Sequence, residues 1–118
     1  MAREKESNEH RPWGWYRVLV EENNFKVKSI TVLPGKRLSL QRHKFRDEHW
    51  LVLRGEGVVT RNDEKTVLSA GQSLDIPREV LHRVFNRGEG DLVILEVQTG
   101  VYFGEDDIER IEDDFGRR

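Results

Sequence analysis

The chain has 118 residues and a formal net charge of −2, with 20 Lys and Arg against 22 Asp and Glu. This length suits one domain with one modest core. Without a basic excess we expect no nucleic-acid partner, and without an apolar run of ~20 residues we expect no membrane partner. The absence of cysteine excludes disulfides and thiolate metal ligands. Residues 1–10 are charged and lack the apolar segment of a signal peptide, so we expect a cytoplasmic protein.

The N-terminal part divides into a polar stretch and an aromatic cluster. Residues 1–10 are predicted to form a polar, mobile tail, and residues 11–118 a single domain. Trp13, Trp15 and Tyr16 follow the tail, interrupted by Gly14. We interpret these aromatic side chains as core or dimer contacts rather than as a ligand cage.

Short segments rich in Val, Leu and Ile follow, separated by Gly, Asn, Asp or Pro. They cover residues 25–33, 37–43, 49–53, 58–61, 66–68, 72–76, 82–85 and 92–98. Many short strands with turn residues between them predict an all-β antiparallel sandwich or barrel. The exception is Glu105 to Asp114, whose acidic start favours a helix N-terminus. We expect one or two helical turns there, packed on the outside.

Four polar residues of the predicted strands are candidate ligands for a metal ion. Gln41 and His43 are two apart, so strand alternation puts them on one face. Glu48 follows after a short polar connection, and His82 opens a much later strand. In an antiparallel barrel these four side chains can converge at one interior point. Two imidazoles, a carboxylate and an amide oxygen suit one divalent ion of Zn, Mn, Co, Fe or Ni.

The spacing of these residues resembles the two sequence motifs of the cupin family. The first motif is matched at Gly35, Gln41, His43, Glu48 and Gly55, with glutamine where many cupins have histidine. The second motif is matched at Gly71, Pro77, His82 and Asn86, with Glu79 where glycine is usual. The resemblance implies a jelly-roll barrel, also called a double-stranded β-helix. It also implies that His43, Glu48 and His82 bind the ion, and that Gln41 binds or faces it.

A narrower resemblance covers nearly the whole chain. It is carried by Arg11-Pro12-Trp13-Gly14, Leu38 to Gln41, Arg46 to Trp50, Ile76-Pro77, His82-Arg83, Glu96-Val97-Gln98 and Gly104 to Ile108. These stretches are similar to the isomerase domain of type II phosphomannose isomerases. In that family the domain usually follows a mannose-1-phosphate guanylyltransferase domain. We see no room for that domain and no glycine-rich nucleotide loop.

The resemblance therefore implies a metal-dependent aldose–ketose isomerase that interconverts mannose 6-phosphate and fructose 6-phosphate. The expected partner is a small sugar phosphate. One departure from the family bears on substrate choice or rate. Lys44 and Phe45 stand where the family often has further histidines before Arg46.

The last predicted strand offers a proton-transfer residue. Leu92, Ile94, Glu96 and Gln98 share one face by alternation. If this face points inward, Leu92 and Ile94 fill the closed end of the barrel. Glu96 then lies at the mouth as the proton-transfer or orienting residue, with Gln98 beside it to bind substrate. The alternative is a buried polar pair, Glu96 and Gln98, that only holds strands together.

Three basic residues are candidates to contact the substrate. Lys28 and Arg46 are placed to hold the phosphate or to stabilise the enediolate, although solvent-facing charges are common on strands. Arg83 is a weaker substrate-binding candidate, because its parity opposes that of His82. His49 should likewise point away from the face of Glu48, as a structural or interface residue.

Two other functions fit the same sequence. One is a metal-dependent cupin enzyme that acts on another sugar, or an oxygenase, because one fold hosts many chemistries. The other is a non-catalytic module that binds a sugar phosphate. A homodimer is expected in each case, since exposed edge strands tend to be covered and the aromatic N-terminal segment offers a cover.

Overall fold

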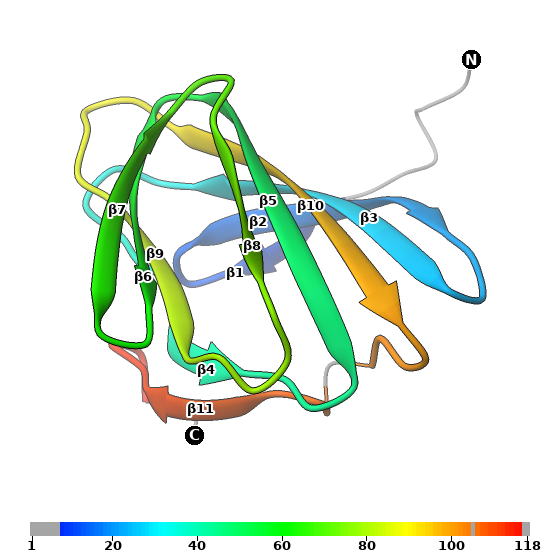
Figure 1. The fold of residues 1–118 in the computed structure, drawn as a ribbon. Helices are drawn as coiled ribbons and strands as arrows, with labels where there is room; N and C mark the ends of the chain where they lie inside the picture. The colour runs from blue at the N-terminus through cyan, green and yellow to red at the C-terminus, as the bar shows by residue number, and fades with distance from the viewer. Residues whose placement is uncertain (1–7, 105, 117–118) are drawn as a thin grey trace, which may run out of the picture.

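The computed structural model describes residues 8–104 and 106–116, which form eleven strands and no helix. The strands make two antiparallel sheets that face each other as a barrel (Figure 1). The six-stranded sheet runs in the order β1 (Glu9–Arg11), β2 (Gly14–Glu21), β3 (Phe25–Val32), β10 (Leu92–Gly100), β5 (Arg46–Arg54) and β8 (Ser73–Ile76). The five-stranded sheet runs in the order β11 (Glu109–Glu112), β4 (Leu40–Arg42), β9 (His82–Asn86), β6 (Glu56–Arg61) and β7 (Glu64–Ser69).

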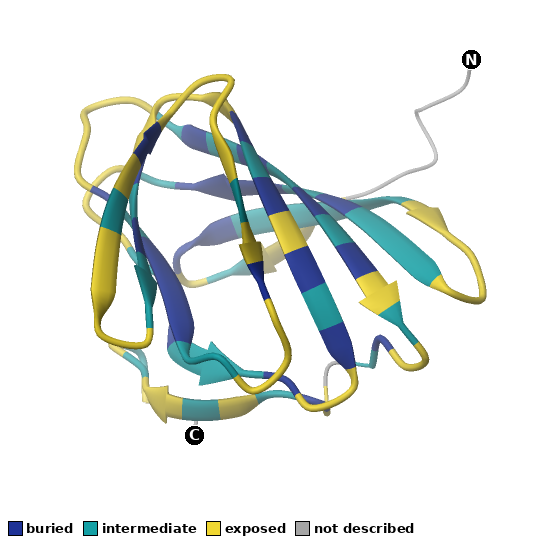
Figure 2. Cartoon of the chain, in the orientation of Figure 1, coloured by how far each residue is buried: buried dark blue, intermediate teal, exposed yellow. Residues whose placement is uncertain are grey.

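The core lies between the sheets and follows from strand alternation. Along β5, buried residues recur at every second position, and Figure 2 shows them as dark bands between paler ones. On β10 the inward residues are Leu92, Ile94, Glu96 and Gln98, all of them buried. Only Leu92 and Ile94 belong to the hydrophobic core. The predicted inward face of this strand is thus confirmed, with an apolar end and a polar end.

Strand β10 fixes which polar side chains become neighbours. It pairs with β3 on one side, where Glu96 stands opposite Lys28. On the other side it pairs with β5, where Gln98 stands opposite Glu48. Directly opposed residues in antiparallel strands lie about 5 Å apart. The register alone therefore gathers four buried polar side chains at one end of the sheet.

The predicted helical turns at Glu105 to Asp114 are wrong for the described residues. Residues 109–112 form β11, which pairs antiparallel with β4. Its acidic side chains meet arginines of the five-stranded sheet, with Glu109 Oε1 2.7 Å from Arg42 Nε. The nearby Asp114 forms two hydrogen bonds of 2.8 Å with Arg37. The acidic composition reflects these ion pairs at a sheet edge rather than a helix N-terminus.

The predicted tail is wrong for its last two residues. Glu9 and His10 belong to β1 and pair with Tyr16 and Trp15 of β2, whereas residues 1–7 of the predicted tail lie outside the described residues. A turn at Asn62-Asp63 joins β6 to β7, and Asn62 has a φ of 52°. None of the described residues forms a helix that is long and apolar enough to cross a membrane.

Candidate metal centre and pocket

Three of the predicted ligands come together between the two sheets. His43 follows β4, Glu48 lies on β5 and His82 opens β9. Their ligand atoms all lie within 4.8 Å of one another, and all three side chains are buried. Glu48 is central: its Oε2 is 3.2 Å from His43 Nε2, and its Oε1 is 3.7 Å from His82 Nε2. This group could hold a metal ion.

The two imidazoles are oriented as metal ligands require. His43 Nδ1 lies 2.8 Å from the carbonyl oxygen of Asp107, and His82 Nδ1 lies 2.9 Å from that of Val80. A carbonyl only accepts, so each Nδ1 carries the proton. With a metal ion bound, each Nε2 would offer its lone pair on the side of Glu48, an arrangement typical of metal-bound histidine. Without the ion, an N–H at Nε2 of His43 donates to Glu48 Oε2 at 3.2 Å. The donor set therefore fits a divalent ion that accepts nitrogen and oxygen ligands.

Gln41 lines the same pocket. It stands directly opposite His82 where β4 pairs with β9, so the side chains of Gln41 and His82 lie on the same face of the sheet. Its amide nitrogen donates to Ser39 Oγ at 2.9 Å, so the amide oxygen is the atom left for a cation. Ligation by Gln41 stays a prediction.

Glu48 is held by three further donors. Arg46 Nε lies 3.3 Å from its Oε2, and Gln98 Nε2 donates to the same oxygen at 3.3 Å. Trp50 Nε1 donates to Oε1 at 3.1 Å. Burial raises the pKa of Glu48, but the hydrogen bond with His43 and the charges of His82 and His43 outweigh it, so the pKa lies well below its usual value. Glu48 is therefore a carboxylate at neutral pH.

Glu96 is a second buried carboxyl beside the first. Trp50 Nε1 donates to its Oε2 at 3.0 Å and Gln98 Nε2 to its Oε1 at 3.0 Å. The same two donors thus bridge Glu48 and Glu96. Burial, together with the negative charge of Glu48, raises the pKa of Glu96 to about 8. Glu96 and Gln98 are therefore both a buried polar pair and part of the pocket wall.

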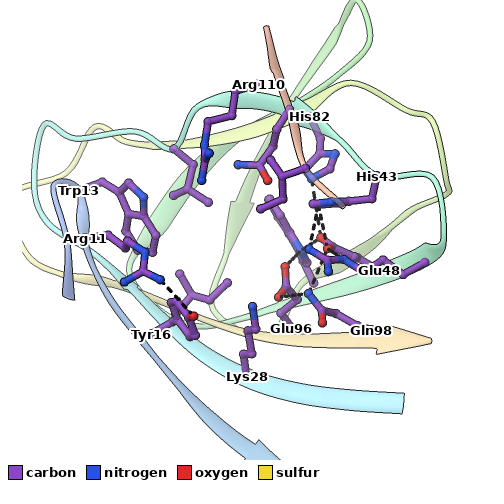
Figure 3. Close-up of a pocket in the computed structure, with 16 residues that line it drawn as sticks. Arg11, Trp13, Tyr16, Lys28, His43, Glu48, His82, Glu96, Gln98 and Arg110 are labelled. Carbon is purple, nitrogen blue, oxygen red and sulfur yellow. Dashed lines mark hydrogen bonds and ion pairs between the residues drawn. The ribbon is translucent and has the colours of Figure 1, made fainter. Parts of the chain in front are cut away.

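The rest of the pocket wall carries positive charge and aromatic rings, and Figure 3 shows Arg11, Trp13 and Tyr16 away from His43 and Glu48. Lys28, the predicted substrate contact, is buried and its Nζ lies 4.3 Å from the centre of the Tyr16 ring. Arg11 Nη2 donates to the Tyr16 hydroxyl at 3.3 Å. Trp13 and Arg110 also line the pocket. The space inside is about 50 Å³, enough for an ion and a few waters.

Several of these residues were missed in the sequence. Arg11 lies on β1, directly after the predicted tail. Tyr16 lies on β2 and was expected to be a core or dimer contact, but it lines the pocket. Arg110 was hidden by the predicted helix, although the alternation of Ile108 and Arg110 on one side and Glu109 and Ile111 on the other was a usable signal.

Two sequence candidates lie away from this pocket. Arg83 is directed to the other side of the five-stranded sheet, where its Nε donates to the Leu38 carbonyl and its Nη1 pairs with Glu112. Its parity opposes that of His82, so the structure does not bring it to the site. His49 is exposed and pairs with Asp75 at 2.6 Å, in agreement with its outward direction.

Comparison with known proteins places this geometry in a family. Residues 2–113 match the family described as mannose-6-phosphate isomerase C-terminal. The chain belongs to this family. A xanthan biosynthesis protein, XanB of Xanthomonas campestris pv. campestris (strain B100), is 51% identical over 92% of this chain. The alginate biosynthesis protein AlgA of Pseudomonas aeruginosa is also 51% identical over 92% of it. The chain spans only 23% and 22% of the lengths of these two relatives.

Solved structures confirm the predicted cupin fold for this member of the mannose-6-phosphate isomerase C-terminal family. Oxalate decarboxylase OxdC of Bacillus subtilis aligns over 92% of this chain and 31% of its own, with a TM-score of 0.81 and 20% identity. KdgF from Halomonas sp. aligns over 89% of this chain and 94% of its own, with a TM-score of 0.76 and 17% identity. At these identities the likeness concerns the fold alone.

The raised pKa of Glu96 predicts that the stability of the metal-free protein falls as the pH rises. In the unfolded chain Glu96 ionises near its ordinary pKa of 4.5, but in the folded protein only near about 8. Between these values the unfolded state binds fewer protons, so the free energy of unfolding decreases with pH. Burial lowers the pKa of His82 from 6.5. Its own effect on the pH dependence of stability is therefore confined to pH values below 6.5.

Urea unfolding in EDTA at roughly pH 6.5 and 8.5 measures this slope. Glu96→Gln should flatten it. Glu89→Gln, at an exposed loop position, should keep it. Equal slopes in the wild type and Glu96→Gln would show that Glu96 is not held protonated.

Proposed function

We propose that this chain is a metal-dependent aldose–ketose isomerase that interconverts mannose 6-phosphate and fructose 6-phosphate. The observation that carries the proposal is a pair of buried carboxyls with opposite tendencies. Glu48, beside the two histidines, has a lowered pKa, whereas Glu96 has a pKa raised to about 8. Neighbouring groups with separated pKa values are typical of a ligand or stabiliser paired with a proton-transfer residue.

The reaction moves a proton between C2 and C1 of the open sugar. Glu96 is the residue suited to carry it, since a pKa near neutrality allows both uptake and release. Trp50 and Gln98 donate to its two oxygens and so fix the direction of the carboxyl group. A divalent ion held by His43, Glu48 and His82 would supply positive charge for the oxygens that become negative during the transfer.

The basic residues of the pocket wall are suited to binding the phosphate group of the substrate. Arg11, Lys28 and Arg110 line the pocket, and Figure 3 shows Arg11 and Lys28 away from the two histidines. Arginine and lysine are the usual partners of phosphate oxygens. Arg46 is less suited to this role than the sequence suggested, because it is held by Glu48 and by the Gly104 carbonyl. We assign it to balancing the charge of Glu48.

The side-chain amide of Gln98 has an acceptor that no described residue uses, which supports the predicted role of Gln98 in substrate binding. Its Nε2 is used by Glu48 and Glu96, but its Oε1 is buried and accepts no hydrogen bond from the described residues. A buried acceptor without a donor is costly. A sugar hydroxyl is a donor of the right kind. Because the inner space is small, binding a hexose phosphate requires the long side chains of Arg11 and Arg110, both half-exposed, to move.

The test is turnover of mannose 6-phosphate in an assay coupled to detection of fructose 6-phosphate, with the protein loaded in turn with Zn, Mn, Co, Fe and Ni. Metal-dependent turnover is expected, and its loss in EDTA should be reversed by adding the ion back. Tight binding of mannose 6-phosphate at full metal occupancy without turnover would instead identify a non-catalytic module. Faster turnover of unphosphorylated mannose would contradict the phosphate assignment.

Replacing Arg11 with alanine should weaken substrate binding with little effect on the chemical step. Loss of one charge-assisted contact to phosphate corresponds to about 1.5–3 kcal/mol, or roughly a 10- to 100-fold rise in KM. Steady-state kinetics with mannose 6-phosphate measure this change. Arg54→Ala, which removes an exposed arginine at the far end of β5, should leave KM unchanged. A fall in kcat with constant KM would place Arg11 in the chemical step instead.

A further inference from the structure

We propose that Asp107 is a positioning residue for the metal centre. It fixes the ring of His43 and the turn between His43 and the strand of Glu48, and so sets the affinity for the ion. This inference rests on the metal site assigned under the proposed function. Asp107 is not one of the predicted metal ligands and does not line the central pocket. Its contacts nevertheless reach the centre from the C-terminal part of the chain.

The carboxylate of Asp107 clamps the turn between β4 and β5. Its Oδ1 accepts the backbone N–H of Lys44 at 3.0 Å, and its Oδ2 accepts that of Phe45 at 3.0 Å. The side chain is buried, with 8% exposure, so these charge-assisted bonds are shielded from water. The clamped residues are the two that follow His43 and precede the strand of Glu48. Asp107 therefore fixes the spacing of two ligands.

The main chain of Asp107 acts on the first ligand directly. Its carbonyl oxygen lies 2.8 Å from His43 Nδ1, and this contact sets which nitrogen of the ring carries the proton. Partners of this kind orient a ligand and raise its basicity. One residue thus holds the ring of His43 through its carbonyl and the backbone after His43 through its carboxylate.

The same segment braces Glu48 through a second path. The carbonyl oxygen of Gly104 accepts the N–H of Asp107 at 3.1 Å, and it also accepts Arg46 Nη1 at 3.2 Å. Arg46 in turn lies 3.3 Å from Glu48 Oε2. His82 is different, because its Nδ1 contact is to Val80, two residues away. Damage at Asp107 should therefore disturb His43 and leave His82 in place.

Co²⁺ titration of the metal-free full chain, followed by visible absorption, tests the proposal. Asp107→Ala removes both acceptors and should weaken Co²⁺ binding about 10- to 100-fold, the range for partners of metal ligands. Asp107→Asn keeps one acceptor but sets an amide N–H against a backbone N–H, and should give an intermediate loss. The control is Asp106→Asn, which changes the same charge at the neighbouring exposed residue, a partner of the Tyr102 hydroxyl.

A second measurement separates positioning from general loosening. In ¹⁵N spectra of the imidazoles of the Zn-loaded wild type, both His43 and His82 should show a protonated Nδ1 and a metal-bound Nε2. Asp107→Ala should disturb this signature at His43 alone. If that variant does not fold, the comparison is made with Asp107→Asn.

Co²⁺ affinity within twofold of the wild type in folded Asp107→Asn, or equal disturbance of both histidines, would overturn the proposal. A wild type that fails to bind Co²⁺ would overturn it together with the metal site. A wild type that binds Co²⁺ without isomerase turnover would refute only the activity, and the Co²⁺ affinities of the variants would still decide the role of Asp107.

Discussion

His82→Ala is expected to remove the bound metal ion and to reduce isomerase turnover by about 10³-fold or more, since a metal ion contributes several kcal/mol to stabilising developing negative charge. His82 is the only one of the three grouped ligands that comes from β9. Its loss leaves the ion with His43 and Glu48 from the neighbouring turn. The variant should still fold, because His82 is not one of the hydrophobic residues that form the core cluster.

Metal content after dialysis and turnover of mannose 6-phosphate measure this effect together. His49→Ala is the matched control, since His49 is exposed and contacts Asp75 on the outer side of the six-stranded sheet. We expect a stability loss of about 1–3 kcal/mol in His82→Ala, because the imidazole packs edge-on against Trp50 with ring centres 5.5 Å apart. Normal metal content in folded His82→Ala would contradict the assignment of this residue as a ligand.

Glu96→Gln is expected to reduce kcat by about 10²- to 10⁴-fold, the usual contribution of a general acid–base residue. Glutamine has nearly the same shape but cannot accept the proton. Metal binding should change much less than kcat, because Glu96 is not among the grouped ligands. KM should also change little, since the proposed phosphate-binding residues Arg11, Lys28 and Arg110 are unchanged.

Isomerisation in D₂O gives this prediction a second readout. If Glu96 exchanges its proton with solvent between the two halves of the reaction, the wild-type product carries deuterium at the receiving carbon. Glu89→Gln should behave as the wild type in both kcat and deuterium content. Full activity of Glu96→Gln would assign proton transfer to another group and reduce Glu96 to a strand-linking residue.

Much of the barrel and its polar end could be predicted from strand alternation alone. Glu96 and Gln98 were placed inward because they share parity with Leu92 and Ile94, and this is what the structure shows. The same rule argues against Arg83, a predicted substrate-binding residue that the structure does not bring to the site. Parity is a local property of a strand, so it can be read without knowing which strand lies next to which.

The features that were missed depend on contacts between distant segments. The acidic stretch around Asp107 favours a helix by local charge, but its carboxylates form ion pairs with Arg42 of β4 and with Arg37, which precedes β4. Tertiary contacts override such weak propensities. Arg11 follows a polar stretch with no alternation strong enough to show β1. The pairing of Arg46 with Glu48 was also unreadable, because parity places two side chains on one face without showing whether they touch.

The uneven spacing of the three grouped ligands along the chain bears on how the protein folds. His43 and Glu48 flank one turn, so they approach each other as soon as that turn forms, an event of microseconds. His82 arrives only when β9 pairs with β4 and β6, and such non-local pairings form slowly. Until then the chain offers an ion two of the three donors. We therefore expect the ion to bind after the barrel has closed. It should stabilise the folded state by mass action rather than direct the assembly of the strands.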